Sequence, residues 1–151
     1  IGQVFGPFCA SVTHSFGGMS LLHAVHNGFE VERIACIAPP LDVAYLVDQF
    51  AGVLQLPDQT VQVQKRLLEK RFGDSIWMRF SMTGWVEQLN IPGLLIHDEQ
   101  DSFVHPDNSK RIAHSWVHSE LVLTRGLGHN KILKSRVVIE HLNAFLAPLA
   151  H

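Results

Sequence analysis

Long apolar runs are missing from this sequence, and so are the marks of a secretory leader. No stretch approaches the roughly 20 consecutive apolar residues that a helix needs to cross a bilayer. The first residues lack the charged, apolar and small-residue regions that make up a signal peptide. We therefore expect no membrane span and a cytoplasmic location.

An excess of basic residues is also absent. The 151 residues include 12 Lys and Arg against 14 Asp and Glu, which gives a net charge of −2. Proteins that bind nucleic acid use clustered cations to neutralise phosphates, so this balance argues against a nucleic-acid partner. Only two cysteines occur, Cys9 and Cys36. Both fall in apolar stretches, where we expect buried thiols, and nothing in the sequence supports a disulfide.

Internal repeats, linkers and low-complexity tracts are missing as well. A hydrophobic fraction of 46% over 151 residues is enough for one domain with a substantial core. The first residue is Ile1 rather than Met, and a strand pattern begins a few residues later. We therefore expect the chain to be a piece of a longer protein.

What the sequence does contain is an alternation of short apolar runs with helical patterns. A strand, a helix and a second strand within about 30 residues form a βαβ unit, which implies a parallel sheet covered on both faces. The sequence therefore predicts an α/β fold with a parallel sheet of about four strands flanked by helices. We expect strands at 7–12, 33–38, 93–97 and 120–124, and helices at 19–26, 106–116 and from 135 onward.

The segment 41–90 interrupts this alternation with helical spacing of its own. Apolar residues from Leu46 to Leu54 share one helix face, and a second helix after Pro57-Asp58 ends at Gly73. The run 76–80 is apolar without a clear period and receives no assignment. We expect three parts: 1–40 as the first part of the core, 41–90 as a helical cap, and 91–151 as the remainder of the core.

Ser15 stands where an expected strand turns directly into an expected helix. In such a turn the backbone is crowded, so the residues two positions either side of the serine must be small, and here they are Thr13 and Gly17. The turn holds the hydroxyl clear of the sheet, and the following helix aims N–H groups and partial positive charge at whatever the hydroxyl attacks. Ser15 is thus a candidate nucleophile, although a serine before a helix is commonly an N-cap.

Asp101 and His129 follow the ends of two other expected strands, as Ser15 does. Carboxyl ends of parallel strands meet at one edge of a sheet, where ligands bind. Serine needs a base, histidine titrates near neutral pH, and an aspartate fixes the tautomer of the histidine. The order Ser, Asp, His along the chain is that of one known arrangement of these three groups. Asp98 is a second candidate for the acid; we prefer Asp101, because Asp98 falls where a tight turn is expected.

Together these motifs resemble those of the α/β-hydrolase fold family. The resemblance rests on His14-Ser15-Phe16-Gly17-Gly18, on the run from Ile91 through His97 to Asp101, and on Gly126-Leu127-Gly128-His129. It covers nearly the whole chain but corresponds to the second half of the family's fold, from its fifth strand to its last helix. It implies a partial α/β-hydrolase fold in which residues 41–90 are the variable cap that shapes the substrate pocket.

The resemblance also implies a role for each site residue. Ser15 would be the nucleophile, Asp101 the acid and His129 the base. The backbone N–H of Phe16 would be one oxyanion donor. No metal and no cofactor would take part. Substrate contacts would come from His14, Phe16 and Val104.

Two features depart from the family pattern. Thr13 replaces the usual first glycine of the turn. The family's first four strands are missing, and with them the loop that supplies a second oxyanion donor. Loss of one such donor typically costs on the order of 10²–10³ in rate. We therefore expect this chain to be an impaired catalyst.

The expected function is a serine hydrolase that cleaves an ester, thioester or related acyl bond of a small molecule through an acyl-enzyme. A C–C hydrolase, a lyase or an acyltransferase of the same fold would use the same three residues. The alternative is a truncated, catalytically weak or inactive hydrolase fold that serves as a binding or oligomerisation module. Its motivation is the open edge of the strand at 8–12, through which we expect homo-oligomers to form. His114 and His118 lie four apart without a third ligand nearby, so we expect no metal site.

Overall fold

The computed structural model describes residue 6 and residues 8–147. A four-stranded parallel sheet forms its centre, in the order β1-β2-β3-β4. The sheet confirms the expected α/β class and the expected number of strands. The strands are β1 (Ser11–His14), β2 (Ile34–Ile37), β3 (Gly93–Asp98) and β4 (Ser119–Thr124).

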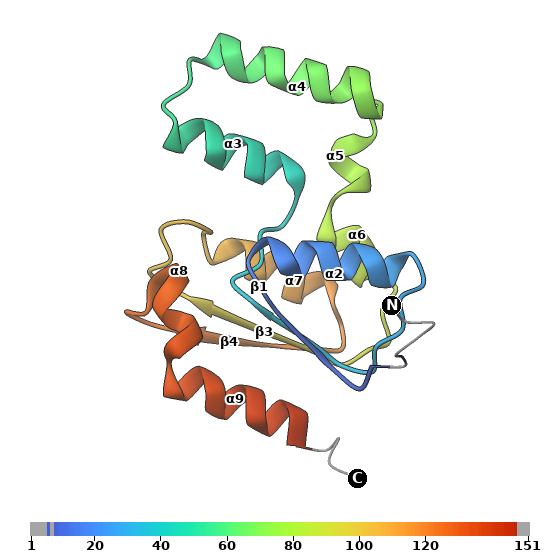
Figure 1. The fold of residues 1–151 in the computed structure, drawn as a ribbon, viewed down its shortest axis with the longest axis vertical. Coiled ribbons are helices and arrows are strands. Elements are labelled where there is room, and N and C mark those ends of the chain that lie inside the picture. The colour runs from blue at the N-terminus through green and yellow to red at the C-terminus, as the bar shows by residue number, and fades with distance from the viewer. Residues whose placement is uncertain (1–5, 7, 148–151) are drawn as a thin grey trace.

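Helices cover the sheet on both sides, as Figure 1 shows. On one side lie α2 (Phe16–His26), α6 (Met82–Val86) and α7 (Asp107–Ser115). On the other side lies α9 (Arg136–Leu146). Between β4 and α9 the chain forms one turn of helix, α8 (Gly128–Lys131), followed by a short 3-10 turn, η1 (Ile132–Lys134). The segment expected to be a loop after the fourth strand is therefore partly helical.

Two hydrophobic clusters fill the space between the sheet and these helices. Successive side chains of a strand point to opposite faces, and both faces of β2 and β3 are buried. Cys36 and Leu95 join the cluster under α2, α6 and α7, together with the fully buried Trp116. Ile37 and Ile96 join the cluster on the side of α9. Burial of apolar surface on both faces stabilises the two inner strands within the sheet.

The helical insertion projects away from the sheet (Figure 1). It consists of α3 (Val43–Val53), α4 (Asp58–Phe72) and α5 (Ile76–Arg79), the last of which had no assignment from the sequence. Two backbone hydrogen bonds close its base, from Val43 N to Phe80 O at 3.2 Å and from Met82 N to Leu41 O at 2.9 Å. Beyond this neck, α6 packs in the core, where Met82 is fully buried. The projecting part is thus shorter than 41–90 and spans residues 43–80.

The start of β1 differs from the expected strand. The strand begins at Ser11, and before it Phe8 makes an isolated bridge to Val31. Cys9 is exposed, so its expected burial is wrong, whereas Cys36 is buried as expected. Both thiols are free. Burial raises the pKa of Cys36 to about 11, even though a hydrogen bond with the Thr13 hydroxyl opposes that shift.

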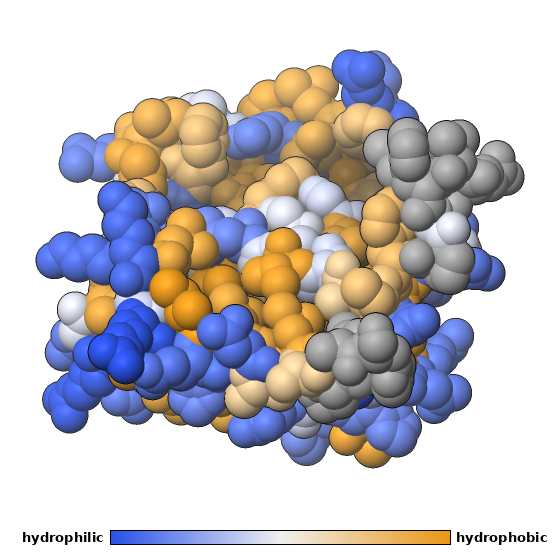
Figure 2. Space-filling view, turned by 60° about the horizontal axis from the view of Figure 1, so that its bottom comes forward, coloured by the Kyte–Doolittle hydropathy of each residue, from blue (hydrophilic) through white to orange (hydrophobic). Residues whose placement is uncertain are grey.

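Part of the sheet face beside α9 is uncovered. Val12 of β1 pairs with Ala35, whose side chain lies in the α9 cluster, so Val12 points to the same face. Val12 nevertheless remains 46% exposed. Figure 2 shows apolar side chains gathered in the middle of the surface seen from below. In the described ranges, no helix combines the length and apolar character needed to cross a membrane.

Candidate active site

Ser15 occupies the single residue between β1 and α2, in a strained conformation. Its φ of 55° and ψ of −131° lie in a region that residues with a side chain seldom adopt. Such a conformation costs on the order of 1–3 kcal/mol and persists only where the surroundings impose it. Here the sheet does so, because Ser15 N donates to Ile37 O at 2.8 Å. The strain therefore supports this serine as a functional candidate.

The close packing around this turn centres on Gly18. A Cβ atom at Gly18 would lie 3.1 Å from Pro39 Cβ and 3.3 Å from Cys36 Sγ, whereas one at Gly17 would lie 3.7 Å from Thr13 Cβ. Both distances at Gly18 are tighter than nine in ten real Cβ contacts, whereas the distance at Gly17 is an ordinary van der Waals contact. Thr13 fits without crowding, and its hydroxyl donates to Ala35 O at 3.3 Å. The tight glycine position thus lies one residue later than the sequence pattern suggested.

His129 links Ser15 to Asp101. Its Nδ1 lies 2.6 Å from Asp101 Oδ2, and its Nε2 lies 3.1 Å from Ser15 Oγ. A carboxylate only accepts hydrogen bonds, so Nδ1 carries the proton and Nε2 is free to accept from the serine hydroxyl. Gly126 and Gly128, both with positive φ, shape the backbone that presents the ring on α8. The three side chains that the sequence singled out therefore meet in one hydrogen-bonded chain.

Asp101 is held by its own loop, which we call the acid loop (residues 101–105). Its side chain is fully buried. Oδ1 accepts hydrogen bonds from Phe103 N at 2.8 Å and Val104 N at 2.9 Å, which leaves Oδ2 for His129. The side chain of Val104, expected to contact substrate, is buried at 5% exposure. Val104 thus contributes to the site through its backbone.

Asp98, the other candidate for the acid, ties the end of β3 to the segment before His129. Its Oδ2 accepts from Thr124 Oγ1 at 2.9 Å and from Leu127 N at 3.0 Å, and its Oδ1 accepts from Gln100 N at 3.0 Å. Burial alone would raise the pKa of Asp98, but these bonds, together with one from Gly128, lower it below its ordinary value. Asp98 is thus an ionised anchor for the segment before His129, and its side-chain hydrogen bonds go to Gln100, Thr124 and Leu127.

Two other aromatic side chains border His129. His14 packs against it with ring centres 4.6 Å apart, and its Nε2 lies 3.0 Å from the backbone oxygen of His129. Burial lowers the pKa of His14, although its hydrogen bond to that oxygen acts in the opposite direction. Phe103 lies on the acid loop with its ring centre 5.6 Å from that of His129, and it is 58% exposed. Phe103 was not predicted as a site residue; its only signal in the sequence is an aromatic side chain two positions after Asp101.

The first turn of α2 brings one backbone donor and an apolar hollow to this site. Phe16 is the first residue of α2, where backbone N–H groups have no acceptor within the helix. Its side chain is 55% exposed. Beside it lies a cavity of about 110 Å³ between α2 and the neck of the insertion. The cavity is lined by Phe16, Met19, Ser20, His23, Phe80 and Trp85.

The insertion contacts the acid loop directly. The hydroxyl of Tyr45, on α3, accepts a hydrogen bond from His105 N at 2.8 Å. Gln49, one turn further along α3, donates from Nε2 to Phe103 O. The position of α3 is therefore coupled to the loop that holds Asp101.

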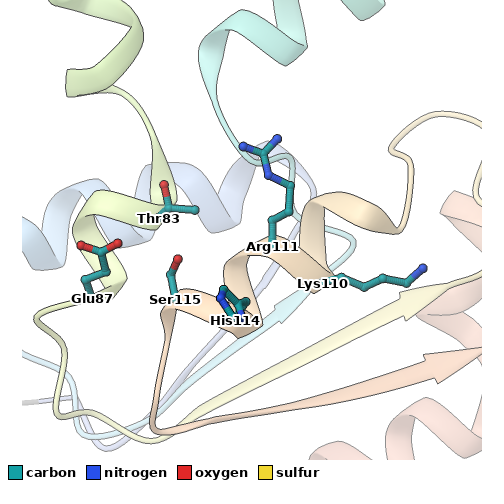
Figure 3. A pocket seen from close by; sticks show the side chains of 6 residues that line it. All are labelled: Thr83, Glu87, Lys110, Arg111, His114 and Ser115. Atoms are coloured by element: carbon teal, nitrogen blue, oxygen red, sulfur yellow. The ribbon is translucent and has the colours of Figure 1, made fainter.

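A second, more open hollow of about 360 Å³ lies between α6 and α7. Its lining does not include Ser15, Asp101 or His129, and Figure 3 shows that its long polar side chains, such as Lys110 and Arg111, point away from one another. His114 belongs to this lining. Among the described residues, no group of three or more His, Cys, Asp or Glu side chains is placed to hold a metal ion.

Comparison with solved structures identifies the fold. The mouse α/β-hydrolase domain-containing protein 10 matches 97% of this chain at 19% identity, with a TM-score of 0.67. A monoacylglycerol lipase from Paleococcus ferrophilus matches 97% at 16% identity and TM-score 0.63, and the esterase domain of a Rhodothermus marinus protein matches 91% at 20% identity and TM-score 0.61. No protein-family model and no curated protein sequence matches the chain.

The chain thus has the α/β-hydrolase fold. It spans 63%, 70% and 61% of the lengths of these three structures, respectively, and so corresponds to a part of that fold. At identities of 16–20% the likeness is one of fold, and the activities in these names are those of the neighbours.

Proposed function

We propose that this chain carries the catalytic triad of a serine hydrolase that cleaves an ester, thioester or related acyl bond of a small molecule. The observation that carries the proposal is the chain of two hydrogen bonds from Asp101 through His129 to Ser15, ending on a strained serine. The α/β-hydrolase fold of the chain supports it. Ser15, Asp101 and His129 act as nucleophile, orienting acid and base.

In the first half of the reaction, Ser15 Oγ attacks the carbonyl carbon while its proton passes to His129 Nε2. The carbonyl oxygen becomes negatively charged and accepts a hydrogen bond from Phe16 N–H at the start of α2. The tetrahedral intermediate then expels the alcohol or thiol, which takes the proton from His129. Asp101 stabilises the transient imidazolium.

In the second half, water repeats the sequence on the acyl-enzyme. His129 takes a proton from the water while the water oxygen attacks the acyl carbon. His129 then gives this proton to Ser15 Oγ as the ester bond to Ser15 breaks. The products are the free acid and the original enzyme. No metal or cofactor is required for either half.

The oxyanion site proposed here has one hydrogen-bond donor from this chain, the N–H of Phe16, where a complete site has two. In the α/β-hydrolase fold the second donor comes from the loop after the third strand, which precedes the nucleophile strand. We propose that this donor lies outside the 151 residues and that the chain by itself reacts about 10²–10³ times more slowly than a complete site would.

The insertion is proposed to shape the substrate site as a cap. Its helix α3 is tied to the acid loop through Tyr45 and Gln49, and the exposed ring of Phe103 lies beside His129. The apolar lining of the 110 Å³ cavity next to Phe16 suits a short acyl or aryl group better than a charged one.

The proposed nucleophile is tested by labelling with a fluorophosphonate, which forms a covalent adduct with an activated serine. The intact chain should be labelled at Ser15, and Ser15→Ala and His129→Gln should abolish the signal. Ser115→Ala, at a serine on α7 outside the lining of the cavity beside Phe16, is the matched control and should react like the intact chain. Equal labelling of the Ser15→Ala and intact chains would reject the proposal.

An alternative function, a binding or oligomerisation module, is favoured by the open side of β1. Among the described residues β1 has one strand neighbour, β2, and its other edge is unpaired. Val12 on that strand is half exposed, and unpaired edges next to apolar surface invite association. The proposal is a homo-oligomer joined along β1. Light scattering at micromolar concentration tests it: a dimer or larger species supports it, and a clean monomer contradicts it.

A further inference from the structure

His97 is a buried histidine that the proposed chemistry does not use. It lies near the end of β3 and is fully buried. Its Nδ1 lies 2.6 Å from Ser109 Oγ on α7, and its Nε2 lies 2.8 Å from Val104 O. The same Nε2 is 3.4 Å from Asp101 Oδ2. One ring thus connects β3, α7 and the acid loop.

The partners of His97 determine which nitrogen carries its proton. The carbonyl of Val104 and the carboxylate of Asp101 only accept hydrogen bonds, so Nε2 must be protonated. The Ser109 hydroxyl then donates to the lone pair on Nδ1. In the opposite tautomer the Nε2 lone pair would face two oxygens and would be repelled by both. The two acceptors at Nε2 therefore select one tautomer of a neutral ring, and Ser109 satisfies the Nδ1 lone pair of that tautomer.

His97 acts on the same residue that holds Asp101. The N–H of Val104 binds Asp101 Oδ1 at 2.9 Å, and the carbonyl of Val104 binds His97. Because its N–H and its carbonyl are both bound, the peptide planes on both sides of Val104 are restrained. The second contact, at 3.4 Å, places an N–H beside Oδ2 without displacing His129, whose own distance to Oδ2 is 2.6 Å. His97 is thus placed to fix the direction in which the carboxylate points.

We propose that His97 and Ser109 are positioning residues for Asp101. The acceptors at Nε2 fix the neutral Nε2–H tautomer of His97, and the hydroxyl of Ser109 holds the ring in place through Nδ1. His97 in turn holds Val104, so that Asp101 Oδ2 stays aligned with His129 Nδ1. Burial is the main influence on the pKa of His97 and lowers it, which keeps the ring neutral near pH 7, although the bonds to Val104 and the charge of Asp101 oppose that shift. The other charged or titratable group that acts on the ring, His129, also lowers its pKa.

The tautomer is tested on the intact chain by ¹⁵N NMR of histidine-labelled protein. His97 should show a protonated Nε2 and an unprotonated Nδ1. The hydrogen bond between His129 and Asp101 should give a separate low-field proton signal. A proton on His97 Nδ1 with Nε2 bare would overturn the proposal, and this result does not depend on any variant folding or on activity.

The coupling is tested with variants at the two positions. Ser109→Ala and His97→Leu should weaken or abolish the low-field proton of His129 and lower the rate of fluorophosphonate labelling about tenfold to a hundredfold, as a misplacement near 1 Å would. With an ester substrate, the loss should fall on kcat rather than KM. His97→Gln, whose amide donates to Val104 O, should recover much of the loss. Ser115→Ala, further along α7 and outside this contact network, is the matched control.

The outcomes distinguish this inference from the proposed function, on which its effect on rate rests. If the intact chain is never labelled at Ser15, the proposed function fails, and the NMR signals still test the positioning of Asp101. If Ser109→Ala and His97→Leu are folded and keep both the low-field proton and the full labelling rate, the inference is overturned and the triad is not.

Discussion

Asp98 and Asp101 are three residues apart, and exchanging each for asparagine should have opposite effects. In Asp98→Asn, an amide N–H₂ replaces an oxygen that accepts hydrogen bonds. Whichever way the amide turns, one backbone N–H, of Leu127 or Gln100, faces another donor. One buried unsatisfied group costs about 1–3 kcal/mol. For a chain of 151 residues, the melting temperature should fall by about 2–12 °C.

In Asp101→Asn the damage should be chemical. The amide oxygen can still accept from Phe103 and Val104, so stability should change by less than about 1 kcal/mol. The amide N–H₂ then faces His129 and turns its Nδ1 into an acceptor, which places the proton on Nε2. His129 can no longer take the proton of Ser15, and labelling should slow by about 10³–10⁴.

Thermal melting and fluorophosphonate labelling rates, measured on both variants and the intact chain, check this pair of expectations. Asp98→Asn should melt earlier and, in the folded fraction, should lose much less of its labelling rate than Asp101→Asn does. A chain with Asp98→Asn that melts like the intact protein but is labelled as slowly as Asp101→Asn would refute the assignment of Asp101 as the acid.

Three further expectations concern the core and the titratable groups. A Cβ at Gly93 would lie 2.5 Å from the ring of the fully buried Trp116, so Gly93→Ala should destabilise the fold by about 1–3 kcal/mol in urea titrations; an unchanged midpoint would contradict this packing. The pKa of His97 is lowered in the folded chain. As the pH falls through the ordinary histidine value near 6.5, the unfolded chain therefore binds more protons than the folded chain does. The stabilising contribution of His97 is present above that pH and is lost below it. The melting temperature should therefore decline less between pH 7.5 and 5 in His97→Gln than in the intact chain. Iodoacetamide should modify the exposed Cys9 and spare Cys36, whose pKa is about 11; mass spectrometry that finds native Cys36 modified at a comparable rate would contradict its burial.

The strand ends were the most predictable part of the molecule. Parallel strands were expected from a short βαβ pattern, and their carboxyl ends must lie along one edge. From that rule alone, Ser15, Asp101 and His129 are predicted to lie in the same region of the molecule. The distances that join them, 2.6 Å and 3.1 Å, depend on how the loops are supported and could not be obtained from spacing.

What the sequence did not predict depends on contacts between distant residues. The helix α6 is too short for a periodic pattern, and its burial results from packing against α2 and α7. Asp98 and His97 are ordinary residues of a strand end in the sequence, and their roles come from partners on β4, α7 and the acid loop. Cys9 lies in an apolar stretch, but the strand begins two residues later and leaves it exposed.

The most direct measurement of the central claim is the mass of the fluorophosphonate adduct and its position in the peptide map. If Ser15 is the activated nucleophile, the intact chain should gain one adduct on the peptide that carries Ser15, and Ser15→Ala and His129→Gln should gain none. An intact, folded chain that gains no adduct after prolonged exposure to excess probe, or gains it at another serine, would contradict the claim.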